Sequence, residues 1–296
     1  MKTNSYVTTC PVGCAVLLET TAYVLPEGPL RRCGNSGNSG NSGGSGGCGQ
    51  LISAVDEKRY WETMASFNAP GFNQPPAREI ERRRSVASRR LQTVTRLLDK
   101  KPAEIRLVDI GCSRGQFVDF AVQAGFNAEG VEPAPDIAAA ARALGLNVRT
   151  GLLEEQHYPD AAFDVASLFE VVEHLREPLP LLRECRRVLK PGGILIISTG
   201  NAASWTVAAM GARWDYFHIE KDGGHISFFN PASIAVMAQN AGFHVERIET
   251  ARVKFHEKGD VSNMTYMLGK IAAELLNVPA RIAGRGHDML AYLRRA

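Results

Sequence analysis

The fold is decided by a short stretch that reads Leu107-Val108-Asp109-Ile110-Gly111-Cys112-Ser113-Arg114-Gly115. An apolar run ends at Asp109 and passes directly into a turn with small residues at the alternate positions 111, 113 and 115. A second acid, Glu132, ends the next apolar run, at 128–132. A strand, a glycine-rich turn, a helix and a second strand that ends in an acid form the layout of a nucleotide-binding α/β unit.

The residue types in this turn indicate the kind of ligand. Gly111 and Gly115 let a ligand approach the backbone where a Cβ atom would collide, and Ser113 stands where a third glycine is usual. Asp109 lies at the carboxyl end of its strand, where open α/β sheets bind ligands. A carboxylate there suits a ligand with an ammonium and a sulfonium, and Glu132 can accept two hydrogen bonds from ribose hydroxyls. Either acid alone could simply face water, but together they favour S-adenosylmethionine over NAD.

From residue 106 onward, the pattern predicts strands that alternate with helices. Strands are expected at 106–110, 128–132, 148–150, 164–169, 193–199, 243–249 and 288–294, and helices at 115–124, 135–144, 178–189, 231–241 and 262–276. Lys190-Pro191-Gly192-Gly193 predicts a helix stop, and Asn230-Pro231 predicts a helix start. Such alternation is typical of a mainly parallel sheet covered on both faces.

Composition limits the class of protein. With 296 residues, 45% of them apolar, the chain is long enough for one large domain with a small appendage. A net charge of +3 gives little support for nucleic-acid binding. We find no long apolar run and no secretory leader pattern, so we expect a protein of the cytoplasm without membrane insertion. In that compartment, six cysteines are expected as thiols or metal ligands rather than disulfides.

The pattern divides the chain into three parts: a cysteine-containing module at 1–55, a helical extension at 56–101 and an α/β domain at 102–296. The first part holds Cys10, Cys14, Cys33 and Cys48, with a linker-like run of Asn, Ser and Gly at 35–47. Both cysteine pairs resemble the halves of a four-cysteine zinc ribbon, and both depart from its usual spacing. Bound structural zinc and a degenerate ribbon of free thiols are both open. The arginine-rich run at 79–98 is predicted to be a helix with a solvated face, so nucleic-acid contact is unlikely.

Four segments in this order resemble class I S-adenosylmethionine-dependent methyltransferases, over about residues 100–250. Residues 109–115 resemble the first motif of that family, Glu132 its ribose-binding acid, 163–175 its fourth strand with the following loop, and 189–193 the turn before its fifth strand. The resemblance implies a Rossmann-like, doubly wound sheet of seven strands in the order 3-2-1-4-5-7-6, with strand seven antiparallel and helices on both faces.

The resemblance also implies which residues contact S-adenosylmethionine: Asp109, Gly111, Cys112, Ser113, Gly115, Phe117, Glu132, Pro133, Leu152, Leu153, Phe169, Glu170 and His174. Ser113 is a mild departure, and the adenine region offers leucines where the family often has an aspartate. The cysteine module and the segment 224–230 are similar to a subgroup that acts on small molecules or sugars. A small-molecule or glycan acceptor is therefore implied.

The proton-accepting residue and the acceptor pocket are expected near the ends of strands four and five. His225, His174 and His218 are the candidate bases, although His174 could equally be a structural histidine. An aromatic segment beside polar groups suits a planar or sugar acceptor, and its candidate contacts are Trp214, Tyr216, Phe217, Phe228 and Asn201. These aromatic residues could instead be packed in the core.

The hypothesis that follows is an enzyme that methylates an oxygen atom, or less readily nitrogen or carbon, of a small metabolite, sugar or glycan. An RNA or protein methyltransferase is a second hypothesis, in which the cysteine module and the arginine-rich helix at 79–98 bind a polymer. A non-catalytic, cofactor-binding subunit is a third. NAD-dependent oxidoreduction is disfavoured by the position of Asp109 and by the loop at 169–175.

Overall fold

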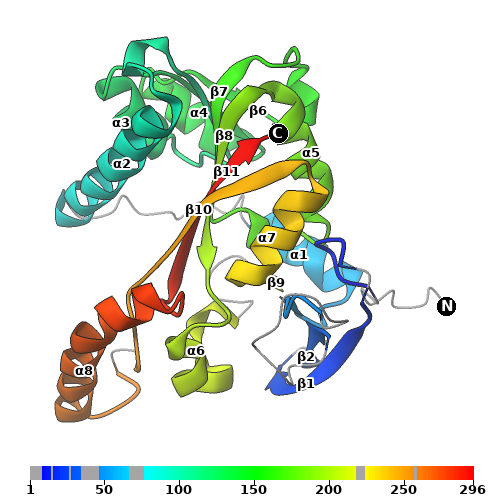
Figure 1. Ribbon diagram of the computed structural model, residues 1–296, viewed down its shortest axis with the longest axis vertical. Helices are drawn as coiled ribbons and strands as arrows, with labels where there is room; N and C mark the ends of the chain where they lie inside the picture. The colour runs from blue at the N-terminus through cyan, green and yellow to red at the C-terminus, as the bar shows by residue number, and fades with distance from the viewer. Residues whose placement is uncertain are drawn as a thin grey trace.

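The computed structural model describes residues 9–14, 16–26, 28–34, 47–66, 77–217, 224–256 and 259–296. Its main sheet has seven strands: β4 (Arg106–Ile110), β5 (Asn127–Glu132), β6 (Val148–Thr150), β7 (Phe163–Phe169), β8 (Leu189–Gly200), β10 (Phe243–Ala251) and β11 (Asp288–Arg295). They lie in the order β10-β11-β8-β7-β4-β5-β6 (Figure 1). Strand β11 runs antiparallel to both of its neighbours, whereas β4 to β8 are parallel. This is the implied order of the seven strands, so the fold prediction is confirmed.

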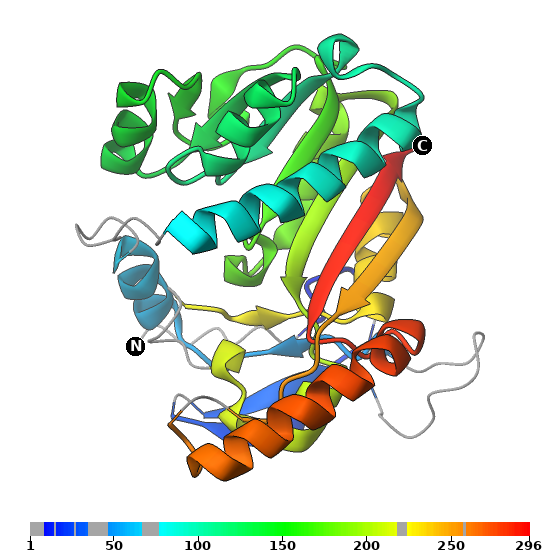
Figure 2. The ribbon, with the colours of Figure 1, turned by 90° about the vertical axis from the view of Figure 1, so that its left-hand side faces the viewer.

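Helices cover both faces of this sheet because successive strand residues point to opposite sides. Leu107 packs with α2 (Ala77–Leu98), α3 (Gln116–Gln123) and α4 (Pro135–Ala143), whereas Val108 packs with α5 (Pro178–Val188) and α7 (Pro231–Asn240). Helix α2 crosses the sheet face in Figure 2. Each face therefore has its own apolar core.

Two predicted boundaries differ from the structure by four residues or more. Strand β8 begins at Leu189, four residues before the expected start at 193. The turn at 190–193 is an irregularity within β8, where Gly192 has a φ of +76° and the register against β7 shifts. Helix α8 (Asn263–Ile282) passes its expected end at 276 and continues through Pro279. Among the described residues, no helix combines the length and apolar character needed to span a bilayer.

A second, smaller sheet ties the N-terminal segment to the middle of the chain. It contains β1 (Leu18–Leu25), β2 (Gly28–Cys33), β3 (Leu51–Ile52) and β9 (Ser227–Phe228), in that order. Strand β3 pairs antiparallel with β9, which lies between β8 and α7 in the sequence. Figure 1 shows this sheet below α7, beside α6 (Trp205–Met210), with α1 (Glu57–Ser66) nearby. The cysteine-containing segment is thus joined by main-chain hydrogen bonds to the part of the chain that follows β8.

A buried carboxylate joins several elements at the amino end of the main sheet. Asp164 is 2% exposed; it accepts hydrogen bonds from Lys100 Nζ at 2.6 Å, Lys190 Nζ at 2.8 Å and the backbone N–H of Arg106 at 3.0 Å. Burial opposes ionisation, but these partners outweigh it and lower the pKa of Asp164 below its usual value. The charged carboxylate therefore stabilises the fold.

Replacing Asp164 with Asn should lower the free energy of unfolding by about 3 kcal/mol, since two lysines then lose their buried partner. A lowered carboxyl pKa gives stability that is present above the unfolded-state pKa and lost as the pH falls through the folded-state pKa. Urea denaturation should therefore show a difference between Asp164→Asn and wild type at pH 7 that narrows in acid. Asp136→Asn, at an exposed helix start, is the control. Equal stabilities at pH 7 would contradict this role.

Candidate functional site

The turn after β4 holds a tight backbone cradle. Gly111, Ser113 and Gly115 all have positive φ, at +70°, +50° and +73°. A Cβ atom on Gly111 would come within 2.7 Å of Val171, and one on Gly115 within 2.6 Å of Leu146, so side chains are excluded at both positions. Backbone N–H groups in such a turn are well placed to meet a ligand.

Glu132 braces this cradle. One carboxylate oxygen accepts the Ser113 N–H at 2.8 Å, and the other accepts the Ala134 N–H at 3.0 Å. A carboxylate has about four acceptor sites, so both oxygens can also accept ribose hydroxyls. Burial raises the pKa of Glu132, while the two backbone donors favour its charged form. Glu132 thus organises the turn in addition to the ribose contact implied by sequence.

Asp109 lies beside Glu132, at the end of the neighbouring strand. Its side chain is buried and accepts the Ser167 hydroxyl at 2.6 Å. Burial raises the pKa of Asp109 to about 7, and the charge of Glu132 adds to this effect. A cationic ligand would therefore relieve the cost of ionising a buried acid. A left-handed cradle next to two buried acids fits the ribose and the ammonium-bearing end of S-adenosylmethionine.

The cradle opens into a cavity of about 2790 Å³. The implied cofactor contacts line it, Gly115 excepted: Asp109, Gly111, Cys112, Ser113, Phe117, Glu132, Pro133, Leu152, Leu153, Phe169, Glu170 and His174. Gly115 lies beneath the cavity against Leu146, and Cys112 also packs against Gly130, where a Cβ atom would come within 2.5 Å of its sulfur. The structure therefore brings the implied cofactor contacts to one place.

Arg90 also lines this cavity, and sequence reasoning missed it. Its guanidinium lies 4.3 Å from the centroid of the Phe169 ring, and Nη2 donates to Ser198 Oγ at 3.4 Å. The arginine-rich run of α2 was interpreted as solvated. However, Arg90 is four residues from Val86 and from Val94, so it lies on the apolar face of the helix. That spacing is the signal that could have identified it.

A cluster of acids, histidines and a tyrosine lies at the same cavity, which Glu170, His174, Tyr216 and His225 line. The Tyr216 hydroxyl donates to Glu173 Oε1 at 2.9 Å and also contacts the carboxylate of Glu170. The ring of Tyr216 lies 4.0 Å from that of His225, which in turn lies 4.8 Å from that of His174, centroid to centroid. Glu173 is fully buried; burial, with the nearby charge of Glu170, raises its pKa well above its usual value.

This geometry gives His225 a defined chemical state. Its Nδ1 lies 3.3 Å from the backbone carbonyl of Tyr216, which favours the tautomer with a proton on Nδ1. Nε2 then keeps its lone pair. Burial lowers the pKa of His225 to about 4, so the ring is neutral at pH 7. One ligand atom each from Glu173, His174 and His225 lies within 4.8 Å of the others, so this cluster can accept a proton or hold a divalent cation.

The other predicted acceptor contacts lie beneath the cavity wall. Trp214, Phe217 and Phe228 are each at most 1% exposed and pack with Leu30 and Leu51 of the small sheet. Trp214 stacks on Tyr216 at 5.0 Å between ring centroids. These aromatic residues support Tyr216 and do not line the cavity, because the small sheet covers them. His218 lies outside the described residues.

Asn201, which was also predicted to contact the acceptor, instead has a structural role. It is fully buried, and its amide donates to the carbonyls of Gly284 and Gly286 at 3.1 and 2.8 Å.

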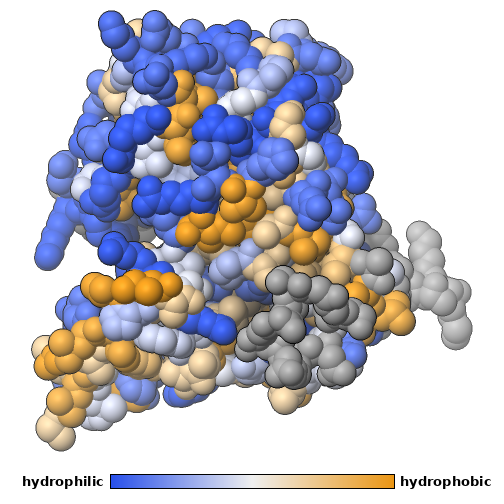
Figure 3. Space-filling view, viewed as in Figure 1, coloured by the Kyte–Doolittle hydropathy of each residue, from blue (hydrophilic) through white to orange (hydrophobic). Residues whose placement is uncertain are grey.

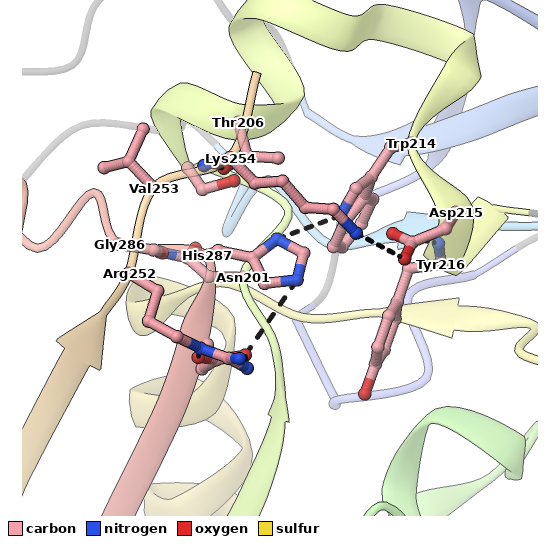
Figure 4. Close-up of polar contacts among 12 residues, drawn as sticks. Asn201, Thr206, Trp214, Asp215, Tyr216, Arg252, Val253, Lys254, Gly286 and His287 are labelled. Atoms are coloured by element: carbon pink, nitrogen blue, oxygen red, sulfur yellow. Dashed lines mark hydrogen bonds and ion pairs between the residues drawn. The ribbon is translucent and has the colours of Figure 1, made fainter. Parts of the chain in front are cut away.

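Nearby, Trp214 Nε1 donates to His287 Nδ1 at 3.2 Å, as Figure 4 shows. This bond occupies the lone pair of His287, so that histidine, which lines the cavity, is a poor candidate base. Lys254 and Asp215 form an ion pair at 3.2 Å at the edge of this group (Figure 4).

The N-terminal cysteines converge at a separate place. The sulfur atoms of Cys10, Cys33 and Cys48 lie within 4.8 Å of one another, and Cys10 and Cys48 are 3.6 Å apart. Tetrahedral zinc with bonds of about 2.3 Å holds thiolates about 3.8 Å apart. The Cys14 thiol is within hydrogen-bonding reach of Cys33. The hydrogen bond from Cys48 lowers the pKa of Cys10 to about 6, although burial opposes it. These thiols fit a structural zinc ion.

Comparisons with known proteins identify the family of the chain. Residues 80–248, more than half of the chain, match a family described as "Methyltransferase domain". The chain is 30% identical over 169 residues to a ubiquinone biosynthesis O-methyltransferase of Xanthomonas axonopodis pv. citri, covering 54% of this chain and 70% of that protein. A relative with the same description from Cereibacter sphaeroides is 33% identical over 148 residues, covering 47% of this chain and 60% of that protein. A crystal structure of a SAM-dependent methyltransferase from Archaeoglobus fulgidus has a TM-score of 0.50 at 22% identity, covering 72% of this chain and 94% of that one.

We expect the purified chain to contain about one zinc ion, because three thiols already converge and Cys14, within reach of Cys33, can supply a fourth ligand. Cys48→Ser should lose most of this metal and lower the melting temperature, since metal binding contributes to folding. Inductively coupled plasma mass spectrometry and thermal melting measure the two effects. Cys185→Ser, at a buried cysteine of the main core, should keep the metal. Zinc below about 0.2 per chain in the wild type would show that these are free thiols.

Proposed function

Because the chain belongs to the family of S-adenosylmethionine-dependent methyltransferases, we propose that it transfers the cofactor's methyl group to an oxygen atom of a small acceptor molecule. The observation that carries this proposal is that His225, with its Nε2 lone pair, and the cradle at Gly111 line one cavity. The names of the relatives, which are O-methyltransferases, support oxygen as the acceptor atom.

The cradle residues have separate tasks toward the cofactor. Glu132 accepts the ribose hydroxyls, and the backbone it braces meets the ligand. At the amino-acid end, Asp109 pairs with the ammonium and Arg90 with the carboxylate, a pairing of charges that suits a zwitterion. Leu152 and Leu153 supply the apolar surface for adenine. When bound, the cofactor supplies an electrophilic methyl group on a positively charged sulfur.

The residues around His225 then handle the acceptor. With the methyl donor bound, the acceptor hydroxyl would give its proton to His225 Nε2, whose lone pair is available at pH 7, while its oxygen takes the methyl group and the S–C bond breaks. Tyr216 holds the carboxylates of Glu170 and Glu173 beside the histidine. Placing acceptor and donor in line can lower the barrier by about 7–11 kcal/mol, and a positioned base adds a factor of about 10²–10⁴.

A small acceptor, such as a metabolite or a single sugar unit, fits better than a polymer. The arginines proposed to grip RNA are engaged within α2, where Arg82 and Arg83 both donate to Glu79 at 2.8 and 3.0 Å. A cation already paired with a carboxylate binds phosphate less strongly. The part of the cavity near His225 is also lined by aromatic and polar side chains, among them Tyr216 and His174.

Replacing Glu132 with Ala should weaken S-adenosylmethionine binding strongly, because the ribose acceptor and the brace on Ser113 are lost together. Glu132→Gln keeps one carbonyl acceptor and should bind with intermediate affinity. Isothermal titration calorimetry with S-adenosylmethionine and S-adenosylhomocysteine measures both variants, and Glu104→Ala, at an exposed position far from the cradle at the amino end of the main sheet, serves as the control. Wild-type affinity in Glu132→Ala would contradict the ribose role.

Replacing His225 with Ala should reduce kcat by about 10²–10⁴ while cofactor affinity stays close to wild type. Turnover of S-adenosylmethionine to S-adenosylhomocysteine, measured with a panel of phenolic and sugar acceptors, gives the rate. His244→Ala, an exposed histidine on β10, is the matched control. Treatment with EDTA separates two roles for the cluster: a base works without a divalent cation, whereas a metal ligand does not. A wild-type rate in His225→Ala would exclude both.

A further inference from the structure

Helix α8 carries an apolar stripe that faces away from the protein. Its members are 54% to 81% exposed: Met264, Met267, Leu268, Ile271, Leu275, Val278 and Ile282. Figure 3, viewed as in Figure 1, shows hydrophobic residues gathered at the lower left, where α8 lies. In Figure 2 the helix lies at the edge of the molecule, with its length open to the viewer. An exposed stripe of this size marks an interaction surface.

The spacing of the stripe indicates what covers it. Six of these residues follow one another at alternating intervals of four and three: 264, 268, 271, 275, 278 and 282. This 3.5-residue period forms the straight seam of two paired helices. The opposite side of α8 already packs on the protein through Ala273, Leu276 and Ala280, beside Val253 and Phe255. The helix is therefore held in place before a partner arrives, which lowers the entropic cost of pairing.

We propose that the apolar stripe of α8 is a dimerisation surface and that its occupant is α8 of a second copy of this chain. A face that is apolar along its centre is complementary to itself, which is the requirement for a two-fold interface. In an antiparallel pair centred at residue 273, Met264 faces Ile282, Leu268 faces Val278 and Ile271 faces Leu275, so the whole seam of one copy meets the seam of the other.

The area of the stripe is sufficient for a stable dimer. Seven apolar side chains, each more than half exposed, offer on the order of 600–800 Å² per copy. A standard protein interface buries about 800 Å² on each partner. Other described parts of the chain expose large apolar residues singly, such as Leu17, Val24 and Val122, and so offer no comparable surface.

The charges of α8 argue against a membrane as the occupant. A helix that lies on an anionic bilayer has a polar face rich in Lys and Arg and aromatic residues at the boundary. Helix α8 carries two cations, Lys270 and Arg281, together with the acid Glu274. Its apolar stripe follows a seam rather than a broad face. A helical partner therefore fits the pattern better than lipid.

Sedimentation velocity on the full-length chain tests this proposal. Across micromolar concentrations, the wild type should sediment with twice the 32.2 kDa mass of one chain. The double variant Leu268→Glu/Leu275→Glu should halve this mass, because four carboxylates would meet in the seam. Val122→Glu places the same charge at an exposed apolar position of α3 and should stay dimeric. A wild type that stays monomeric, including one that binds anionic vesicles instead, would overturn the proposal.

A second measurement does not depend on how the charged variants fold. A photo-reactive benzoylphenylalanine at position 264, which is 74% exposed, should form crosslinks at the mass of two chains. Peptide mapping should place both ends of the crosslink within α8. Crosslinks between two copies that map to another element would show that the dimer forms elsewhere and would equally overturn the proposal.

Discussion

The site depends on the hydrogen bonds that the backbone N–H groups of Ser113 and Ala134 donate to the Glu132 carboxylate. The bond to Ser113 joins the turn after β4 to the end of β5, and it holds Ser113 at a φ of +50° between Gly111 and Gly115, which also have positive φ. A serine in that conformation is uncommon, and a carboxylate that accepts its N–H compensates for the cost. The same contact leaves the acid facing the cavity, so one side chain both builds the binding surface and forms part of it.

Much of the fold follows from local patterns in the sequence. Strands β4 to β8 are short apolar runs between turn signals, and their order follows from the resemblance to a known family. The early start of β8 could not be predicted, because a Pro-Gly-Gly sequence is typical of a turn. Here Gly192 adopts positive φ and lets the strand bend without ending. The pairing of β3 with β9 joins two-residue segments far apart in the sequence, and no local pattern encodes such a contact.

In the site, too, some residues could be predicted from local sequence patterns and others depend on contacts between distant segments. The acids and glycines of the cofactor side occupy strand ends, where topology alone brings them together. On the acceptor side, composition identified an aromatic segment but could not separate Tyr216, which lines the cavity, from Trp214 and Phe217, which support it. That distinction depends on the small sheet, which covers Trp214 and Phe217 from the far side. Arg90 was obscured by its arginine neighbours, although its helical spacing places it on the inward face.

The ladder between β3 and β9 has a consequence for the divergence of such proteins. Leu51 and Ile52 follow Cys48 closely, and Ser227 and Phe228 follow His225. The backbone pairing of β3 with β9 therefore fixes the position of the cysteine cluster relative to His225, the histidine proposed as the base. We expect that the segment around His225 can be exchanged between related proteins only together with the cysteine cluster. The segment that contains Cys48 and the segment that contains His225 should therefore be inherited together, although about 180 residues separate them in the chain.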